Sequence, residues 1–269
     1  MKHMADNLAR YIRIFFLAAR MQALRLLTKR FALVAYGAGK LLRMGFFLVF
    51  GLALFKNSSS IAGFSRGELL VCYAMMNAVD VVTQMIFLRG LTQLQMLIKK
   101  GTLDQLLVKP VSPLFWLSVS LFDWIDFITL PGVIAYLWYA VRALEYAPSV
   151  ANILFACGLG VVGIAIAYGI MLSIAAVSFY VEDAENVWWL YRDFIYSSRN
   201  PPALFPRGVQ QVFTFVIPIF AIVSFPALGL VGRLSGWFAL WACVAAVLFV
   251  TLGLALWRRG LRMYSSASS

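Results

Sequence analysis

An uninterrupted apolar run, VANILFACGLGVVGIAIAYGIMLSIAAVS, occupies residues 150–178. The run contains no charged side chain, and as a helix it is long enough to cross the roughly 30 Å of hydrocarbon in a bilayer. Apolar blocks of similar length recur along the rest of the chain. They lie at residues 31–55, 68–88, 115–140, 208–228 and 236–257. The sequence therefore predicts an all-α integral membrane protein with six transmembrane helices.

The composition supports this class. Hydrophobic residues make up 62% of the 269 residues and charged residues 13%, whereas soluble domains carry roughly 45–50% and 25%. A water-soluble globule is therefore excluded. We expect residues 1–269 to form one transmembrane domain, with an N-terminal segment at 5–30, the six spans within 31–257 and a cytoplasmic tail at 258–269.

The N-terminal segment has the pattern of an amphipathic helix. At about 100° per residue, apolar side chains gather on one side and arginines on the other. The apolar side holds Leu8, Ile12, Phe15, Ala19 and Ala23, and the basic side holds Arg10, Arg13 and Arg20. This pattern predicts a helix that lies in the membrane interface. The alternative is a cytoplasmic extension of the first span.

The basic residues predict the orientation in the membrane. Of the 23 Lys and Arg residues, seventeen fall in the segments on the N-terminal side of the membrane and four on the opposite side, while Lys40 and Arg43 lie inside the first span. Cytoplasmic connections carry the excess of Lys and Arg, so we expect both termini in the cytoplasm. The net charge of +12 does not indicate nucleic acid as a partner, because the basic residues form no patterned basic domain.

Two connections on the cytoplasmic side are more than linkers. In GTLDQLLVKPVSP, residues 101–113, Gly101 breaks one helix and Thr102 is positioned to cap the next, with Gln105 closing a capping box. A short helix, Leu103 to Val108, then ends before Pro110 and forms a rigid knob at the inner face. We interpret residues 181–207 as a surface helix followed by a stiff, extended approach to the fifth span.

Charged residues inside the predicted spans require partners, because an isolated ion in hydrocarbon is costly. Helical rise places five of them at a common depth, roughly 12 to 18 Å from the cytoplasmic boundary. They are Lys40, Arg43, Asp80, Asp123 and Asp126. We interpret them as an ion-pair cluster in which Asp80 reaches Lys40 or Arg43. The alternative is the polar lining of a substrate path or a proton site.

The sequence lacks the residues of several catalytic classes. Gly37-Ala38-Gly39-Lys40 resembles a phosphate-binding loop, but Val34 and Leu41 stand where that loop needs glycine and Ser or Thr. His3 is the only histidine, and the three cysteines lie in apolar runs. We therefore expect no enzymatic activity, no bound cofactor, no metal site and no disulfide.

Two strings together resemble a known family. Residues 101–113 resemble the G-T-L-D-x-x-L-x-K-P-x-x-P segment of an ABC type-2 permease family, most of whose members have unassigned substrates. Residues 200–206, followed by 213–218 and 225–227, are similar to its second signature. The ending is also similar, with Trp257, Gly260, Leu261, Tyr264 and Ser265.

The resemblance implies a permease subunit of an ATP-binding cassette transporter in the bacterial cytoplasmic membrane. A separate pair of cytoplasmic ATPase subunits would bind MgATP, and a second permease, identical or homologous, would complete the path. We expect export of a hydrophobic or amphipathic compound. The implied ATPase-coupling residues are Gly101, Thr102, Leu103, Asp104, Leu106, Leu107, Lys109 and Pro110. Leu103, Leu106 and Leu107 would supply the apolar contact with the ATPase, and Asp104 and Lys109 its polar register.

Two other functions remain open. An ion-coupled secondary transporter would use Asp80, Asp123 and Asp126 and would be driven by a proton gradient. A structural membrane scaffold would not depend on the knob for any ATPase activity.

Overall fold

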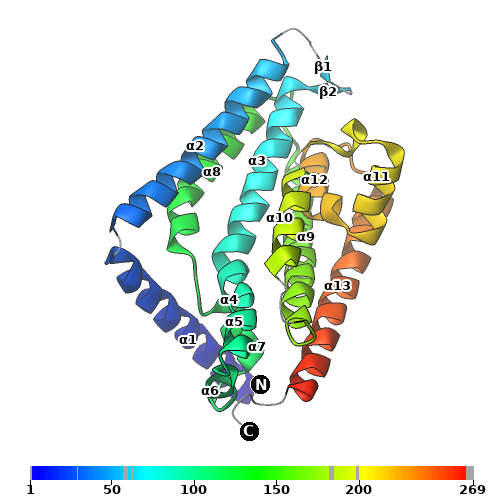
Figure 1. Ribbon diagram of the computed structural model, residues 1–269. Helices are drawn as coiled ribbons and strands as arrows, with labels where there is room; N and C mark the ends of the chain where they lie inside the picture. Colours follow the sequence, from blue (N-terminus) through cyan, green and yellow to red (C-terminus); the bar gives the residue numbers. More distant parts are fainter. Residues whose placement is uncertain are drawn as a thin grey trace.

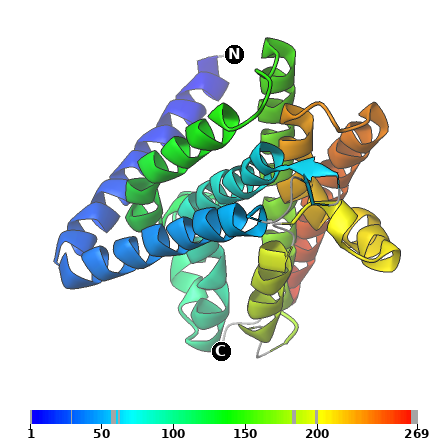
Figure 2. The same ribbon diagram turned by 90° about the horizontal axis from the view of Figure 1, so that it is seen from above.

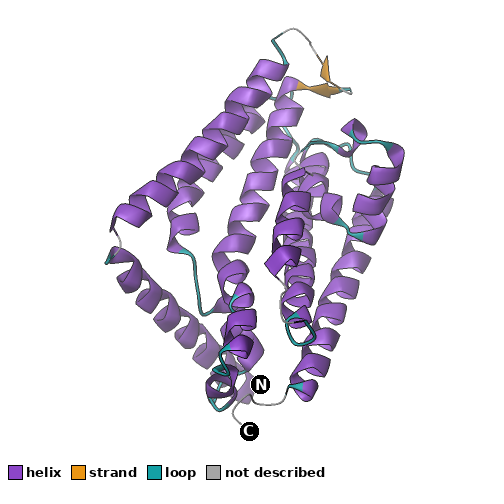
Figure 3. Ribbon diagram, viewed as in Figure 1, coloured by secondary structure: helices purple, strands orange, loops and turns teal. Residues whose placement is uncertain are grey.

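The computed structural model describes residues 2–28, 30–56, 60–61, 63–181, 185–197 and 200–264, and nearly all of them are helical (Figures 1 and 3). One small antiparallel hairpin pairs Ser60 with Ser65 at the end of the molecule away from α6. The elements are α1 (Lys2–Leu27), α2 (Arg30–Leu54), β1 (Ser60–Ile61), β2 (Phe64–Ser65), α3 (Arg66–Thr83), the π-helix η1 (Gln84–Leu88), α4 (Arg89–Thr92), α5 (Leu94–Lys99), α6 (Leu103–Leu107), α7 (Pro113–Val119), α8 (Trp124–Arg142), α9 (Val150–Val177), α10 (Glu185–Ser197), the 3-10 helix η2 (Pro202–Leu204), α11 (Arg207–Gln211), the π-helix η3 (Val212–Val216), α12 (Ile219–Leu230) and α13 (Gly236–Met263).

Five helical segments of the described chain are long and apolar enough to cross a membrane. They are Leu33–Ala53, Arg66–Lys99, Trp124–Arg142, Val150–Val177 and Gly236–Met263. They correspond to the first, second, third, fourth and sixth predicted spans. The protein is therefore an all-α, multi-pass membrane protein.

Three of these spans differ in extent from the prediction. The second continues beyond residue 88 as a helical segment of 34 residues that ends at Lys99. The third does not begin at residue 115, because the chain leaves the helix between α7 and α8 and Asp123 caps the new helix by accepting a hydrogen bond from the amide of Ile125 (2.9 Å). The last helix also continues past residue 257 to Met263.

The predicted fifth span is not a single straight helix. Residues Arg207–Val216 and Ile219–Leu230 are two helical pieces bent by 99°. The second piece, α12, has 12 residues, about 18 Å by helical rise, and is almost wholly buried. Its end lies beside the start of α9, since a Cβ atom on Gly229 would contact Leu159. The pair enters the bundle and leaves again at the end opposite α6.

The chain returns from the α6 end along α10 and the segment that follows it, which the sequence pattern assigned to the cytoplasmic surface. This helix runs antiparallel to α3 (Figure 1). Tyr191 lines a cavity with Thr83, and further along the chain the hydroxyl of Tyr73 donates to the Asn200 side chain (3.0 Å). Tyr73 belongs to the outer part of α3, so the segment from α10 to Asn200 returns the chain from the α6 end to the opposite end.

The position of α10 lowers the number of basic residues in the predicted cytoplasmic connections, but it leaves both termini at the same end of the molecule. Arg192 lies within the α10 crossing and Arg207 begins α11 at the end opposite α6, so neither belongs to the inner connections. Arg199, which was counted with them, lies outside the described residues. The number of passes between the two ends of the molecule stays even, and the start of α1 and the end of α13 lie at the same end as α6 (Figure 1).

The helix α9 is the centre of the packed core. Its contacts with α12 and α13 are so close that two glycines have no room for a side chain. A Cβ atom on Gly163 would lie 2.7 Å from the carbonyl oxygen of Ile222, and one on Gly169 would lie 2.5 Å from the carbonyl carbon of Phe249. Small residues allow such approach between membrane helices.

On the other side of α3, the helices α1, α2 and α8 form a more open group (Figure 2). The helix α1 is attached to the start of α8, where the indole of Trp124 donates to the carbonyl of Ala19 (2.7 Å). The ring of Phe15 also contacts Phe122. The side of α1 that holds Phe15 and Ala19 was predicted to be its membrane face, but it packs against protein.

Candidate transport path and coupling site

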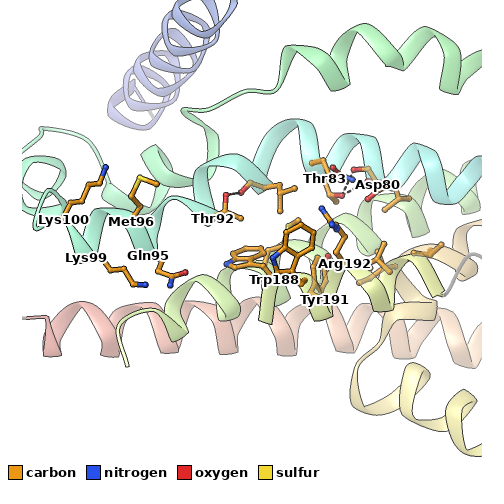
Figure 4. A pocket seen from close by; sticks show the side chains of 18 residues that line it. Asp80, Thr83, Thr92, Gln95, Met96, Lys99, Lys100, Trp188, Tyr191 and Arg192 are labelled. Atoms are coloured by element: carbon orange, nitrogen blue, oxygen red, sulfur yellow. Dashed lines mark hydrogen bonds between the residues drawn. The ribbon is translucent and has the colours of Figure 1, made fainter. Parts of the chain in front are cut away.

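A cavity of about 520 Å³ lies between the α3–α5 segment and α10, with α9 and α12 at its back. Figure 4 shows Trp188, Tyr191 and Arg192 of α10 facing the α3–α5 wall. The cavity follows that wall from Asp80 to Lys100, which is about 30 Å by helical rise. It therefore reaches from the middle of the bundle to the α6 end.

The lining changes in character along this length. The end near α6 carries Lys99 and Lys100, the middle is apolar and aromatic with Met96 and Trp188, and the deep end carries Asp80 (Figure 4). Such a mixed lining suits a compound with both an apolar and a polar part.

Hydroxyl groups on the α3 wall are satisfied within the helix. Thr83 donates to the carbonyls of Val79 and Asp80 (both 2.9 Å), and Thr92 donates to the carbonyl of Leu88 (2.9 Å). They therefore retain only acceptor capacity toward a compound in the cavity. On the opposite wall, the guanidinium of Arg192 lies 3.9 Å from the ring centroid of Trp189.

The structure brings four of the five intramembrane charges into two ion pairs. Lys40 of α2 pairs with Asp126 of α8, whose side chain is 2% exposed. Arg43 lies 3.8 Å from the Asp80 carboxylate and donates to the hydroxyl of Tyr196 at 2.6 Å. Arg43 thus links α2 with both walls of the cavity.

Asp123 pairs with a residue outside the predicted cluster. Its carboxylate lies 2.7 Å from Nε of Arg89, and its amide donates to the carbonyl of Met85 (2.9 Å). Met85 lies in η1, and a π-helical turn leaves backbone groups without their usual partners and occurs frequently at functional sites. Asp123 therefore attaches the break between α7 and α8 to the part of α3 that lines the cavity.

The predicted knob is present, but its N-terminal cap is not. Gly101 has φ 63° and ends the preceding helix, as left-handed glycines do. Thr102 has helical dihedral angles and makes no side-chain cap; its amide donates to the carbonyl of Leu97 (3.0 Å). The predicted capping box with Gln105 is therefore wrong, because Thr102 continues the preceding turn.

The apolar residues of α6 face the permease. Leu103 is 0% exposed and Leu106 is 5% exposed, and both belong to the hydrophobic core that includes Leu91. These two side chains pack inside the permease itself, while Leu107 is half-buried. The knob instead presents Val108, which is 82% exposed. Gln105, Lys109 and Pro110 are exposed beside it.

Contacts from three other elements hold the knob in place. Arg10 of α1 donates to the carbonyl of Pro110, and the ammonium of Lys109 lies 4.3 Å from the ring centroid of Trp116 in α7. Burial raises the pKa of the Tyr264 phenol, and the charge of the neighbouring Asp104 raises it further. Asp104 therefore lies beside the end of α13.

Sequence reasoning missed Arg89, Tyr196 and the α10 wall of the cavity. The sequence pattern places Arg89 in a connection because it follows an apolar block, and it places α10 at the surface because this helix contains Glu185 and Asp193. One signal was present in the sequence: α10 combines these charges with Trp188 and Trp189.

In the described part of the chain, no group of three His, Cys, Asp or Glu side chains could hold a metal ion.

The crossing helices, the cavity and the short helix at one end define a membrane transport subunit. The model of the family described as ABC-2 family transporter protein matches residues 41–268. The chain belongs to this family and is a permease subunit of an ABC transporter, so transport and not catalysis is its role. Neither a curated protein nor a solved structure matches the chain.

Proposed function

We propose that this permease exports a hydrophobic or amphipathic compound through the cavity between α3 and α10, driven by a pair of cytoplasmic ATPase subunits that bind MgATP. The observation that carries the proposal is the extent of the cavity, which begins beside α6 and runs to the level of Asp80. Its Trp188 and Met96 suit an apolar moiety, and Lys100 at its inner end suits a polar one.

The exposed surface of α6 is the proposed contact with the ATPase. Val108 supplies an apolar centre, and Gln105, Lys109 and Pro110 surround it with polar and rigid groups. A buried apolar centre with a polar rim is the usual composition of a specific protein interface. This proposal places α6 and both termini in the cytoplasm of a bacterial cell, with the chain in its cytoplasmic membrane.

The exposed face of α10 supports a second permease as partner. Arg192 and Asp193 are exposed on this crossing helix, next to Trp189 and Leu190, which are 49% and 51% exposed. Charged side chains on a membrane helix face a protein interior or a water-filled path and not lipid. Two permeases, identical or homologous, that meet at α10 would enclose these charges along a shared path.

The three aspartates support this proposal better than an ion-coupled transporter. Asp80, Asp123 and Asp126 each have a basic partner, and these partners come from α2 and α4. Such pairing connects neighbouring helices and gives each aspartate a structural role.

Val108→Asp tests the coupling surface. We expect this change to release the ATPase from the detergent-solubilised complex, because it places a charge at the apolar centre of the contact. The measurement is the amount of ATPase subunit, and of ATP hydrolysis, that co-purifies with the tagged permease.

Val150→Asp is the matched control, because Val150 is 73% exposed at the opposite end of the molecule. It should leave co-purification unchanged. Retention of the ATPase and of its full activity by Val108→Asp would show that α6 is not the contact.

A further inference from the structure

The interfacial helix α1 has one face attached to the permease and one face free of it. On the attached face, Ala18 and Ala19 are buried, Trp124 donates to the carbonyl of Ala19, and the ring centroids of Tyr11 and Phe115 lie 4.6 Å apart. These contacts set which side of α1 points away from the bundle.

The free face is apolar with arginines in its middle. Phe16, Leu17, Met21, Leu24 and Leu27 are between 53% and 65% exposed. Arg13 and Arg20 are also exposed and lie two helical turns apart on the same side. We call Arg13, Phe16, Leu17, Arg20, Met21 and Leu24 the outward face of α1.

The arginines of this face have no acidic partner in the described part of the chain. Residues 9–27 contain no Asp or Glu, and neither Arg13 nor Arg20 takes part in the ion pairs of Lys40, Arg43, Arg89 and Arg233. A helix that combines exposed apolar side chains with unpaired arginines has the composition of one that inserts at the headgroup level of a membrane. There the arginine stems lie along apolar surface while the guanidinium groups reach the phosphates.

We propose that the outward face of α1 binds anionic phospholipid headgroups through Arg13 and Arg20. The proposal rests on the proposed function only for assigning this surface to the cytoplasmic leaflet. Arg10, on the same helix, donates to the carbonyl of Pro110 next to α6. Headgroup binding therefore holds α1 in its position beside α6.

Lipid selectivity at α1 tests the proposal directly. The experiment uses the full chain with Cys72, Cys157 and Cys243 replaced by Ala. In this background Leu17→Cys is labelled with a fluorophore, and the protein is reconstituted in nanodiscs of phosphatidylcholine and phosphatidylglycerol. Either lipid is brominated in turn, at equal mole fraction, and quenching of the label is measured. We expect phosphatidylglycerol to be enriched about fivefold at the label for each arginine that binds it.

Arg13→Gln with Arg20→Gln should abolish this preference while quenching by brominated phosphatidylcholine persists, because α1 stays inserted. Arg258→Gln with Arg259→Gln is the control, since these exposed arginines lie on α13 at the same end of the molecule, and it should leave the preference intact.

Two outcomes would overturn the proposal. Equal quenching by the two lipids in the parent chain would show that the face has no preference for anionic headgroups. Absence of quenching by both would show that protein, such as a second permease, covers it. The nanodiscs contain no ATPase and have equivalent leaflets, so a failure of the proposed function would not change this measurement.

Discussion

The two sides of the bundle are held together in different ways. On the side of α9, α12 and α13, backbones touch at glycines such as Gly169, and the side chains of α12 are almost wholly buried. On the side of α2 and α8, the contact is made by side chains: a Cβ atom added to Gly132 of α8 would lie 3.0 Å from the side chain of Leu41 and 3.2 Å from that of Met44 in α2, and it would meet no backbone atom among its nearest neighbours. There the helices are connected by the ion pairs of Lys40 and Arg43.

This difference indicates which part of the molecule is rigid and which part can move. Helices whose backbones are in direct contact pack in a single arrangement, because sliding one helix along the other would create steric overlap or cavities. Long basic side chains can keep an ion pair while the helices that carry them slide. We therefore interpret α9, α12 and α13 as the static scaffold, and α2 with α8 as the group that moves. The cavity lies where α3 and α10 meet, between these two parts.

The largest expected effect comes from adding one methyl group to the scaffold. Gly169→Ala would place a Cβ atom 2.5 Å from the carbonyl carbon of Phe249, and separating α9 from α13 should cost about 3 kcal/mol or more. Thermal unfolding in detergent, followed by size-exclusion fluorescence, measures the loss.

Gly39→Ala is the matched control on α2. It should be neutral or stabilising by up to about 1 kcal/mol, since alanine favours helix and the site is open. Equal losses at both glycines would remove the distinction between the two sides.

The next effect concerns the ion pair between α2 and α8. Asp126→Asn leaves Lys40 without its partner beside a carboxyl site that is 2% exposed, and we expect a loss of about 3 kcal/mol, reduced by the partial exposure of the lysine. Lys40→Gln in the same chain should restore part of it. A double-mutant cycle on unfolding temperature measures the interaction, and strictly additive losses would contradict direct pairing.

Much of this fold could be predicted from the sequence, because hydropathy reports how apolar a segment is. It placed α2, α9 and α13 within a few residues. It failed for α12, since a helix buried in protein is as apolar as one that crosses lipid. It failed for α10 for the opposite reason, because this helix carries charged residues, of which Arg192 lines the cavity.

The depth of the charged residues was predictable, and so was the pairing of Asp80, which lies 3.8 Å from Arg43, one of its two predicted partners. Helical rise gave the common level of Lys40, Asp80 and Asp126, yet the choice of partner depends on how the helices rotate about their axes. The partner of Asp123 was not found, because the break before α8 turns that residue toward Arg89. The burial of Leu106 was likewise set by tertiary packing, which the local pattern of the knob does not contain.

The smallest effect on stability, and the sharpest on coupling, is expected at Asp123. The pair with Arg89, whose side chain is 48% exposed, should contribute about 1 kcal/mol. Its larger role is to connect α7, which follows the knob, with η1, whose residues Gln84 and Leu88 line the cavity. In Asp123→Asn we therefore expect ATP hydrolysis to continue while the cavity no longer responds to it.

Spin labels at Met96 and Trp189, on opposite walls of the cavity, report this response as a distance. In the parent complex, MgATP with vanadate should change the distance distribution, and in Asp123→Asn the distribution should stay as it is without nucleotide. Lys40→Gln is the comparison, because it breaks an ion pair of α8 that does not touch η1.

If exchanging the two residues, Arg89→Asp with Asp123→Arg, restores the response, the charge pair itself transmits the motion. If Asp123→Asn responds like the parent, the route from the knob to the cavity does not pass through η1, and the contact of Arg43 with Asp80 and Tyr196 becomes the remaining link between the moving helices and the cavity.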